Sequence, residues 1–194
     1  MQRTIHHIAA LGVLWASSAL AQTSLKIDLR FVPDSGLRPE TWKPKGVAIA
    51  LGPITDARGL SDSLQIGESQ ALGPQGIPVV SSSLAVPAFV EQALRVSLAE
   101  WKLVVSADAP FVLRAEVLEL WALEKKRVAA NVRIRFHLED RGGNVLWEGE
   151  LAADDSTWGK THSEKNYIQV LSTATERAIA DLFDKKAFQV ALLR

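Results

Sequence analysis

Residues 128–144 read VAANVRIRFHLEDRGGN, and this stretch decides the fold. From Val128 to Leu138 every second residue is apolar, and polar or charged residues fill most of the positions between them. Alternation of this kind predicts a β-strand that packs one face on a core and turns the other face to water. Asp140 to Asn144 then predicts a hairpin turn, because its glycines can adopt positive φ without a steric penalty.

The segments on either side extend this hairpin into a sheet. Phe111 to Glu124 alternates in the same way and is followed by a charged bend at residues 125–127. Val145 to Leu151 continues the alternation after the turn. Ser24 to Phe31 alternates over a shorter length and predicts a further strand near the start of the chain.

The middle of the chain is less regular. Gly46 to Ile54 is an almost continuous apolar run, which predicts a central strand buried on both faces and ended by Pro53. Residues 55–85 are rich in Gly, Ser, Pro and Asp and predict a long irregular loop. A loop of this length either runs over the surface or contacts a partner, and the sequence leaves both interpretations open.

Two helices complete the expected architecture. Val86 to Trp101 carries apolar residues at helical spacing, with Pro87 in the first turn, where its missing N–H costs nothing. A second helix starts near Thr161, which has capping-box spacing to Glu164, and its apolar stripe leaves Glu176 on the solvent side. We therefore predict an α/β fold of the α+β kind: a mixed, largely antiparallel sheet with two main helices packed on one face.

The start of the chain has the features of an export signal. A positive charge at Arg3 precedes an apolar run, Ile8 to Leu20, which is shorter than the about 20 residues that a bilayer-spanning helix needs. Ala19-Leu20-Ala21 has the small-x-small pattern of a cleavage site. We expect residues 1–21 to be a cleaved signal peptide and residues 22–194 to form a single domain without a transmembrane segment.

Composition and motifs argue against several classes of function. Lys plus Arg and Asp plus Glu both number 22, so the overall charge favours neither nucleic acid nor anionic lipid as a partner. The chain has no cysteine, and after cleavage only His137 and His162 remain, which are too few ligands for a usual zinc site. There is no Gly-x-Ser-x-Gly elbow and no phosphate-binding glycine loop. We predict no catalytic residue, no metal and no cofactor, and therefore no enzyme.

Two tryptophans are candidates for exposed anchors. Trp42 follows a proline-rich segment and Trp158 comes just before the last helix. Exposed tryptophans often anchor contacts with proteins or carbohydrates. Partial burial under loops is the other interpretation of both positions.

Several short motifs resemble those of the YajG-type lipoprotein family. In chain order they are the apolar strand Val47 to Leu51, Asp56-x-Arg58, Ile66-Gly67, the Asp140 to Gly143 turn, and the Tyr167-x-x-x-Leu171-x-x-Ala174 helix. The match extends over roughly Val47 to Phe183. The arrangement is also similar to penicillin-binding-protein activators of the LpoB type and to the N-terminal domain of TolB. The chain departs from the YajG pattern in one respect, since Gln22 stands where the family has its lipobox cysteine.

The resemblance implies a cell-envelope protein without an enzymatic role. We expect it to be periplasmic, either soluble or peripheral to the outer membrane, and to act as a protein-binding or scaffolding module in envelope assembly or maintenance. Its expected partners are other envelope proteins or further copies of itself, and no nucleic acid. A carrier of a lipid or glycan is the alternative, and a hydrolase is less favoured. The candidate contact residues are Asp56, Arg58, Glu68, Trp42 and Trp158, of which Asp56 and Arg58 are also consistent with a local ion pair.

Overall fold

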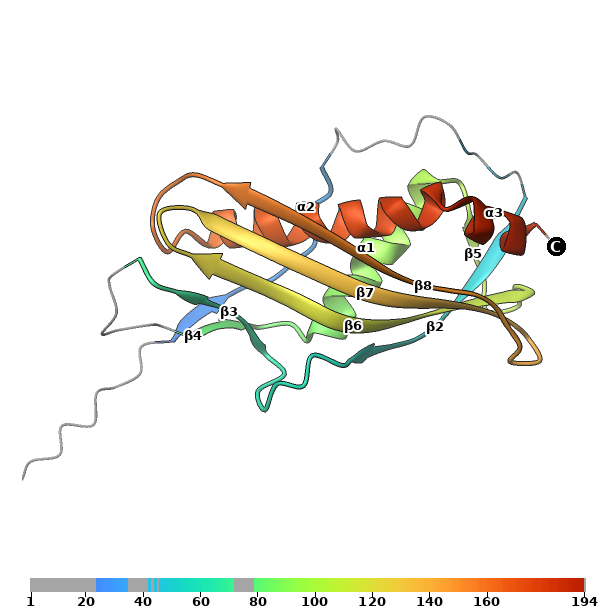
Figure 1. The fold of residues 1–194 in the computed structure, drawn as a ribbon, viewed down its shortest axis with the longest axis horizontal. Helices are drawn as coiled ribbons and strands as arrows, with labels where there is room; N and C mark the ends of the chain where they lie inside the picture. Colours follow the sequence, from blue (N-terminus) through green and yellow to red (C-terminus); the bar gives the residue numbers. More distant parts are fainter. Residues whose placement is uncertain (1–23, 35–41, 43, 45, 72–78, 194) are drawn as a thin grey trace, which may run out of the picture.

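The computed structural model describes residues 24–34, 42, 44, 46–71 and 79–193. The predicted signal peptide, residues 1–21, lies outside the described residues. The described chain forms one sheet and a layer of helices (Figure 1). The strands are β1 (Leu25–Ile27), β2 (Ala48–Asp56), β3 (Gln65–Ser69), β4 (Val79–Ser82), β5 (Val104–Val105), β6 (Phe111–Glu124), β7 (Val128–Asp140) and β8 (Val145–Thr157). The helices are α1 (Val86–Glu100), α2 (Glu164–Asp184) and α3 (Lys186–Leu192).

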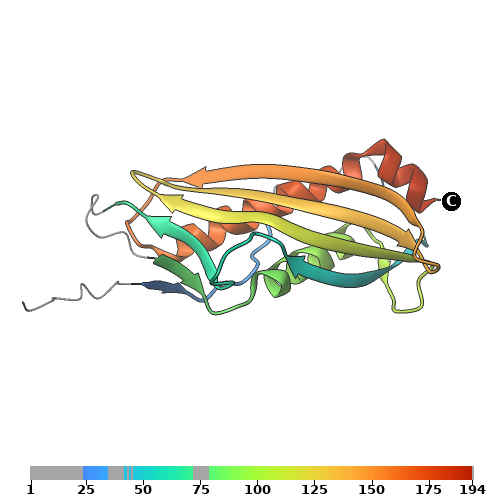
Figure 2. The ribbon, with the colours of Figure 1, turned by 60° about the horizontal axis from the view of Figure 1, so that its bottom comes forward.

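The predicted fold class is confirmed. The strands form one mixed sheet, in which the longest pairings, β6–β7 and β7–β8, are antiparallel, while β2 and β3 run parallel to β6. The helices pack on one face of this sheet (Figures 1 and 2). The alternation from Val128 to Leu138 has the predicted result, since all six apolar side chains on its inward face are buried: Val128, Ala130, Val132, Ile134, Phe136 and Leu138.

The opposite face of β6, β7 and β8 is in contact with water and carries cross-strand ion pairs. Arg133 lies 3.1 Å from Glu150, and Arg135 lies 3.0 Å from Glu116. The hairpin that joins β7 to β8 turns at Gly143, whose φ is 81° as the sequence predicted for a glycine at this turn. A register slip by one residue would bury these arginines, so the charge pattern fixes how the strands pair.

The strand β6 is the centre of the sheet, since other strands pair along both of its edges. The two edges are paired in different ways. β7 pairs along one edge from Phe111 to Glu124. The other edge is divided between β2, which pairs with residues 111–117, and β3, which pairs with residues 122–124. β3 comes very close to β6 at Gly67, where a Cβ atom would collide with the backbone carbonyl of Ala122. Glycine is therefore required at this position by the approach of two backbones.

The prediction for Gly46 to Ile54 was wrong in two respects. The strand is not buried on both faces, because only Ile49 of β2 is fully buried. Pro53 does not end the strand either, since β2 continues to Asp56. The pairing of β2 with β6 shifts register between Leu51 and Ile54, and the exposed Pro53 lies inside that irregularity, where a missing N–H breaks no ladder bond.

Other boundaries also differ from the expectation. The segment 55–85, predicted to be irregular, contains β3 and β4, each too short to show a clear alternation. The Thr161–Glu164 capping box is not formed, because α2 begins at Glu164 with Ser163 as its N-cap and no side-chain capping bond. Glu176, predicted to be solvated, is buried in the layer between α2 and the chain at residues 32–34. None of the described helices is long and apolar enough to cross a membrane.

Candidate contact surface at the β6–β7 turn

The buried carboxylate of Glu124 lies at the end of β6 and joins four parts of the chain. Only 3% of this residue is exposed. Its Oε2 accepts hydrogen bonds from Ser69 Oγ at 2.8 Å and from the Tyr167 hydroxyl at 2.9 Å. Its Oε1 accepts from the backbone N–H of His162 at 2.9 Å. The end of β6 is thus fastened to β3, to the loop between β8 and α2, and to the first turn of α2.

These contacts have the electrostatic effect expected of a buried acid beside a phenol. Burial, and then the hydrogen bond to Glu124, raise the pKa of Tyr167 well above its ordinary value, so the hydroxyl keeps its proton and remains a donor. His162 completes the group, with its Nε2 lying 2.9 Å from Ser69 Oγ. The backbone of His162 has a φ of 55°, which is unusual for a residue other than glycine, and the bond from its N–H to Glu124 helps to hold it.

The Ser69–His162 pair does not have the geometry of a nucleophilic triad. In a triad the acid contacts the ring nitrogen that faces away from the serine. Here Glu124 Oε2 accepts from Ser69 Oγ and lies 3.6 Å from the same His162 nitrogen that contacts the serine. Ser69 is also fully buried, so no substrate carbonyl can reach it. The other histidine, His137, lies on the wet sheet face between Glu116 and Glu148. Among the described residues no cluster of His, Cys, Asp or Glu is arranged to hold a metal ion.

Directly outside this buried group lies an exposed surface that combines cations with a tryptophan. Lys125, Lys126 and Arg127 form the turn between β6 and β7, and all are exposed. Trp158, just after β8, is 71% exposed. With Leu123 and Ala129 these residues line a shallow recess of about 500 Å³. We call the residues Lys125, Lys126, Arg127, Trp158 and the neighbouring exposed Lys160 the tip surface.

The structure places the predicted contact pair Asp56 and Arg58 inside the protein. Arg58 donates from Nε and Nη2 to the two carboxylate oxygens of Asp56, at 2.8 and 2.7 Å. Only 3% of the Arg58 side chain and 18% of the Asp56 side chain are exposed. The guanidinium hydrogen bonds beside Asp56 hold the pKa of that carboxyl below its usual value.

Arg58 also fills the gap on the divided edge of β6. Its Nη1 donates to the backbone carbonyls of Gln65, at 2.6 Å, and Leu120, at 3.3 Å, and its Nη2 donates to that of Ser63 at 2.7 Å. The carbonyl of Leu120 lies on the stretch of β6 between its pairings with β2 and β3, and those of Ser63 and Gln65 belong to the chain that leads into β3. The pair is therefore a structural element of the sheet rather than an exposed contact.

The remaining candidates lie apart from one another. Glu68 is half-buried on β3 and accepts a hydrogen bond from Gln70 at 3.0 Å. Trp42 is half-buried and packs its ring against Trp101 and Phe183, with centroid distances of 6.0 and 6.4 Å. Phe183 and Trp158 lie near opposite ends of α2, so the two candidate tryptophans do not share a surface. Of the five predicted residues, Trp158 alone has a largely exposed side chain.

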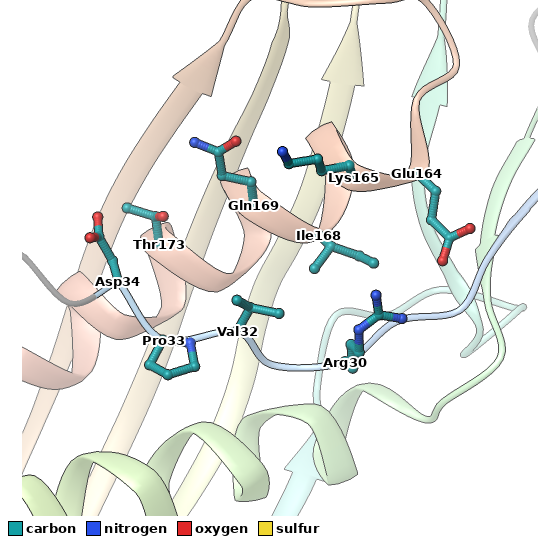
Figure 3. A pocket seen from close by; sticks show the side chains of 9 residues that line it. All are labelled: Arg30, Val32, Pro33, Asp34, Glu164, Lys165, Ile168, Gln169 and Thr173. Carbon is teal, nitrogen blue, oxygen red and sulfur yellow. The ribbon is translucent and has the colours of Figure 1, made fainter.

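A second hollow lies between the start of α2 and the segment that follows β1 (Figure 3). Its volume is about 710 Å³, and it is lined by the charged Arg30, Lys165 and Glu164 together with the apolar Val32 and Ile168. Two hydrogen bonds hold the segment against α2: Val32 N–H donates to Ser172 Oγ at 3.1 Å, and Asp34 N–H donates to Glu176 Oε2 at 2.6 Å.

Sequence reasoning named Trp158 as a contact candidate but missed Ser69, Glu124, His162 and the basic turn as parts of one site. Glu124 is the last residue of an alternating strand, and no local pattern distinguishes it from an ordinary surface charge. The signal that was present is the run Lys125-Lys126-Arg127, which stands in a turn without a neighbouring acidic run.

Comparison with known proteins finds the fold but no family. No family profile matches the chain, and no curated protein matches it. A crystal structure of a DUF330 protein from Xanthomonas campestris superposes with a TM-score of 0.56 at 14% identity, covering 89% of this chain and all of that one. Weaker similarity is found to a minor lipoprotein from Acinetobacter baumannii, with a TM-score of 0.41, 19% identity and coverage of 76% and 94%. A PelC dodecamer from Paraburkholderia phytofirmans is similar with a TM-score of 0.41, 13% identity and coverage of 70% and 90%. The chain thus shares its fold with the DUF330 protein.

The Arg58→Ala variant should lower the free energy of unfolding by about 3 kcal/mol, because Asp56 and several backbone carbonyls would lose their donor in a largely buried place. Urea denaturation followed by circular dichroism measures this. Arg95→Ala is the matched control: it breaks an exposed pair with Glu91 of 2.7 Å and should cost less than about 0.5 kcal/mol. Equal losses in the two variants would show that Arg58 does not support the sheet.

The Glu176→Gln variant should be more stable than the wild type at pH 7. Burial raises the pKa of Glu176, so the folded state disfavours its charge, and the stabilisation from the protonated form is lost as pH rises from the ordinary value of 4.5 through the raised pKa. The difference between the two proteins should therefore shrink as pH falls toward 4.5. Thermal unfolding of both proteins across this pH range measures the difference, and a difference that stays constant with pH would contradict the prediction.

Proposed function

We propose that this chain is an exported cell-envelope protein that acts by binding other proteins and not by catalysis. The observation that carries the proposal is the free outer edge of β8. This strand has 13 residues and pairs with β7 alone, so within the described part of the chain its other edge has no strand beside it. An exposed edge of this length offers a row of backbone donors and acceptors to which a strand of another protein can add.

The outward backbone groups of β8 belong to its even-numbered residues. Arg177 of α2 donates to the carbonyl of Asp154 at 2.8 Å from outside the strand ladder. At the opposite end of the hairpin, the N–H of Asp140 bonds to the carbonyl of Asn144, so that even-numbered residue faces β7, and the register shift between Leu138 and Glu139 reverses the alternation before Glu148. In an antiparallel ladder the N–H and C=O of one residue point to the same side. Glu148, Glu150 and Ala152, which lie in the regular part of the ladder, therefore offer their backbone groups to a partner.

The export pattern of residues 1–21 supports the envelope setting of this proposal. The motifs from Val47 to Ala174 support membership of the YajG-type family, whose members act without known catalysis, and the absent lipobox cysteine supports a periplasmic form without a lipid anchor. The partner is another envelope protein or a second copy of this chain. Strand addition at β8 is possible with either of these partners.

A carrier function is the second candidate, favoured by the hollow beside α2 (Figure 3). Its volume of about 710 Å³ is within the usual range for small-ligand sites. Native mass spectrometry of the protein purified from periplasm would show a lipid or glycan adduct if this function is correct. The Ile168→Trp substitution should fill the hollow and remove that adduct, and a spectrum with bare protein alone would refute the carrier.

The Ala152→Pro variant should fold but lose its protein partner, because proline removes one outward N–H donor and projects its ring from the β8 edge. Ala153→Pro is the matched control, because it should lower stability without removing an outward donor. Ala153 pairs with Val132 of β7, so proline there removes a donor inside the sheet and should destabilise the fold by about 2 kcal/mol.

Periplasmic crosslinking with partner identification measures the loss of binding, and thermal unfolding measures stability. A partner captured by the wild type should be absent from Ala152→Pro samples although that variant melts close to the wild type. Undiminished capture by folded Ala152→Pro protein would rule out strand addition at β8.

A further inference from the structure

The cations of the tip surface are not neutralised by the protein. On the outer sheet face, the arginines are matched to carboxylates, as in the Arg114–Glu139 pair at 2.9 Å. Within the described residues no ion pair involves Lys125, Lys126, Arg127 or Lys160. A chain with no net charge thus concentrates positive charge at one end of its sheet. Such a cluster attracts an anionic surface at short range although the overall charge is balanced.

The aromatic member of this surface is held out to solvent. Trp158 is the most exposed of the large apolar side chains of the described chain, at 71%. It lines the same recess as the basic turn, together with the apolar Leu123 and Ala129. An indole ring that stays in water forgoes the burial that drives folding, which suggests that it is covered by something other than this chain.

The residues beneath the tip surface hold it in a fixed shape. Glu124 precedes the basic turn directly, and its carboxylate binds the N–H of His162, four residues after Trp158. Between these points the carbonyl of Lys160 accepts a hydrogen bond from Asn166 of α2 at 3.2 Å. The turn and the loop are therefore presented together, and little order has to be gained when they bind.

We propose that the tip surface docks onto the headgroup layer of an anionic phospholipid bilayer. Tryptophan side chains prefer the level of the headgroups, where the ring meets apolar chains and the N–H meets water. Lysine and arginine beside it are attracted to the negative charge of the leaflet. The recess has apolar walls and an open rim, whereas a site for a single small anion needs donors that converge from buried positions.

Flotation with lipid vesicles tests the proposal, using the protein purified from the periplasm of an expression host. We expect it to float with vesicles of phosphatidylglycerol and phosphatidylethanolamine and not with vesicles of phosphatidylcholine alone, and to be released as salt is raised. The Lys125→Glu/Lys126→Glu/Arg127→Glu variant should bind at least about 10-fold more weakly, and Trp158→Ser should also bind more weakly. Should the triple variant fail to fold, Trp158→Ser decides the test.

The matched control reverses three exposed lysines far from the tip surface, Lys102, Lys185 and Lys186, and changes the net charge by the same amount. It should bind vesicles like the wild type. Equal weakening in the tip and control variants would overturn the proposal, as would absence of vesicle binding by the wild type. Binding to soluble polygalacturonate without binding to vesicles would assign the surface to an anionic polysaccharide instead. Ala152→Pro should leave vesicle binding unchanged, so failure here is separate from failure of strand addition at β8.

Discussion

A single buried carboxylate determines how one end of this protein is arranged. Glu124 accepts hydrogen bonds from Ser69 of β3, from the backbone of His162 and from Tyr167 of α2. Each donor comes from a different element, and each satisfies part of a charge that would be costly to bury alone. Because the carboxylate is the last residue of β6, the same contacts also fix the turn that follows. The buried group around Glu124 therefore holds the exposed tip surface in place.

The divided edge of β6 poses a second problem that one side chain solves. β2 leaves this edge after pairing with Val117, and β3 joins it near Ala122, so the backbone between them would lack donors. Arg58 supplies them and is itself neutralised by Asp56. An arginine suits this task because its fork of N–H groups reaches a carboxylate and several carbonyls at once.

The sequence predicted well those elements whose pattern of apolar residues lies within the element itself. The period of two in β7 and the apolar stripe of α2 reflect contacts made by every turn or pleat, so they can be read from local spacing. β3 has a single strongly apolar residue, Ile66, and its place depends on a parallel neighbour more than fifty residues away. The Glu124 group joins positions 69, 124, 162 and 167, which no local pattern connects. Net charge likewise hid the basic turn, because a sum over the whole chain carries no information about where the charges lie.

The length of β8 sets how far its unpaired edge extends along the sheet. The strand ends beside Trp158 and extends to the opposite end of the sheet, and its 13 residues span about 44 Å at the usual rise. If the end that bears the indole rests on a membrane, the unpaired edge of β8 begins at the lipid surface and extends away from it. A polypeptide strand bound along this edge would be held at a fixed distance from the bilayer and in one direction. The fold would then act as a spacer as well as a binding partner.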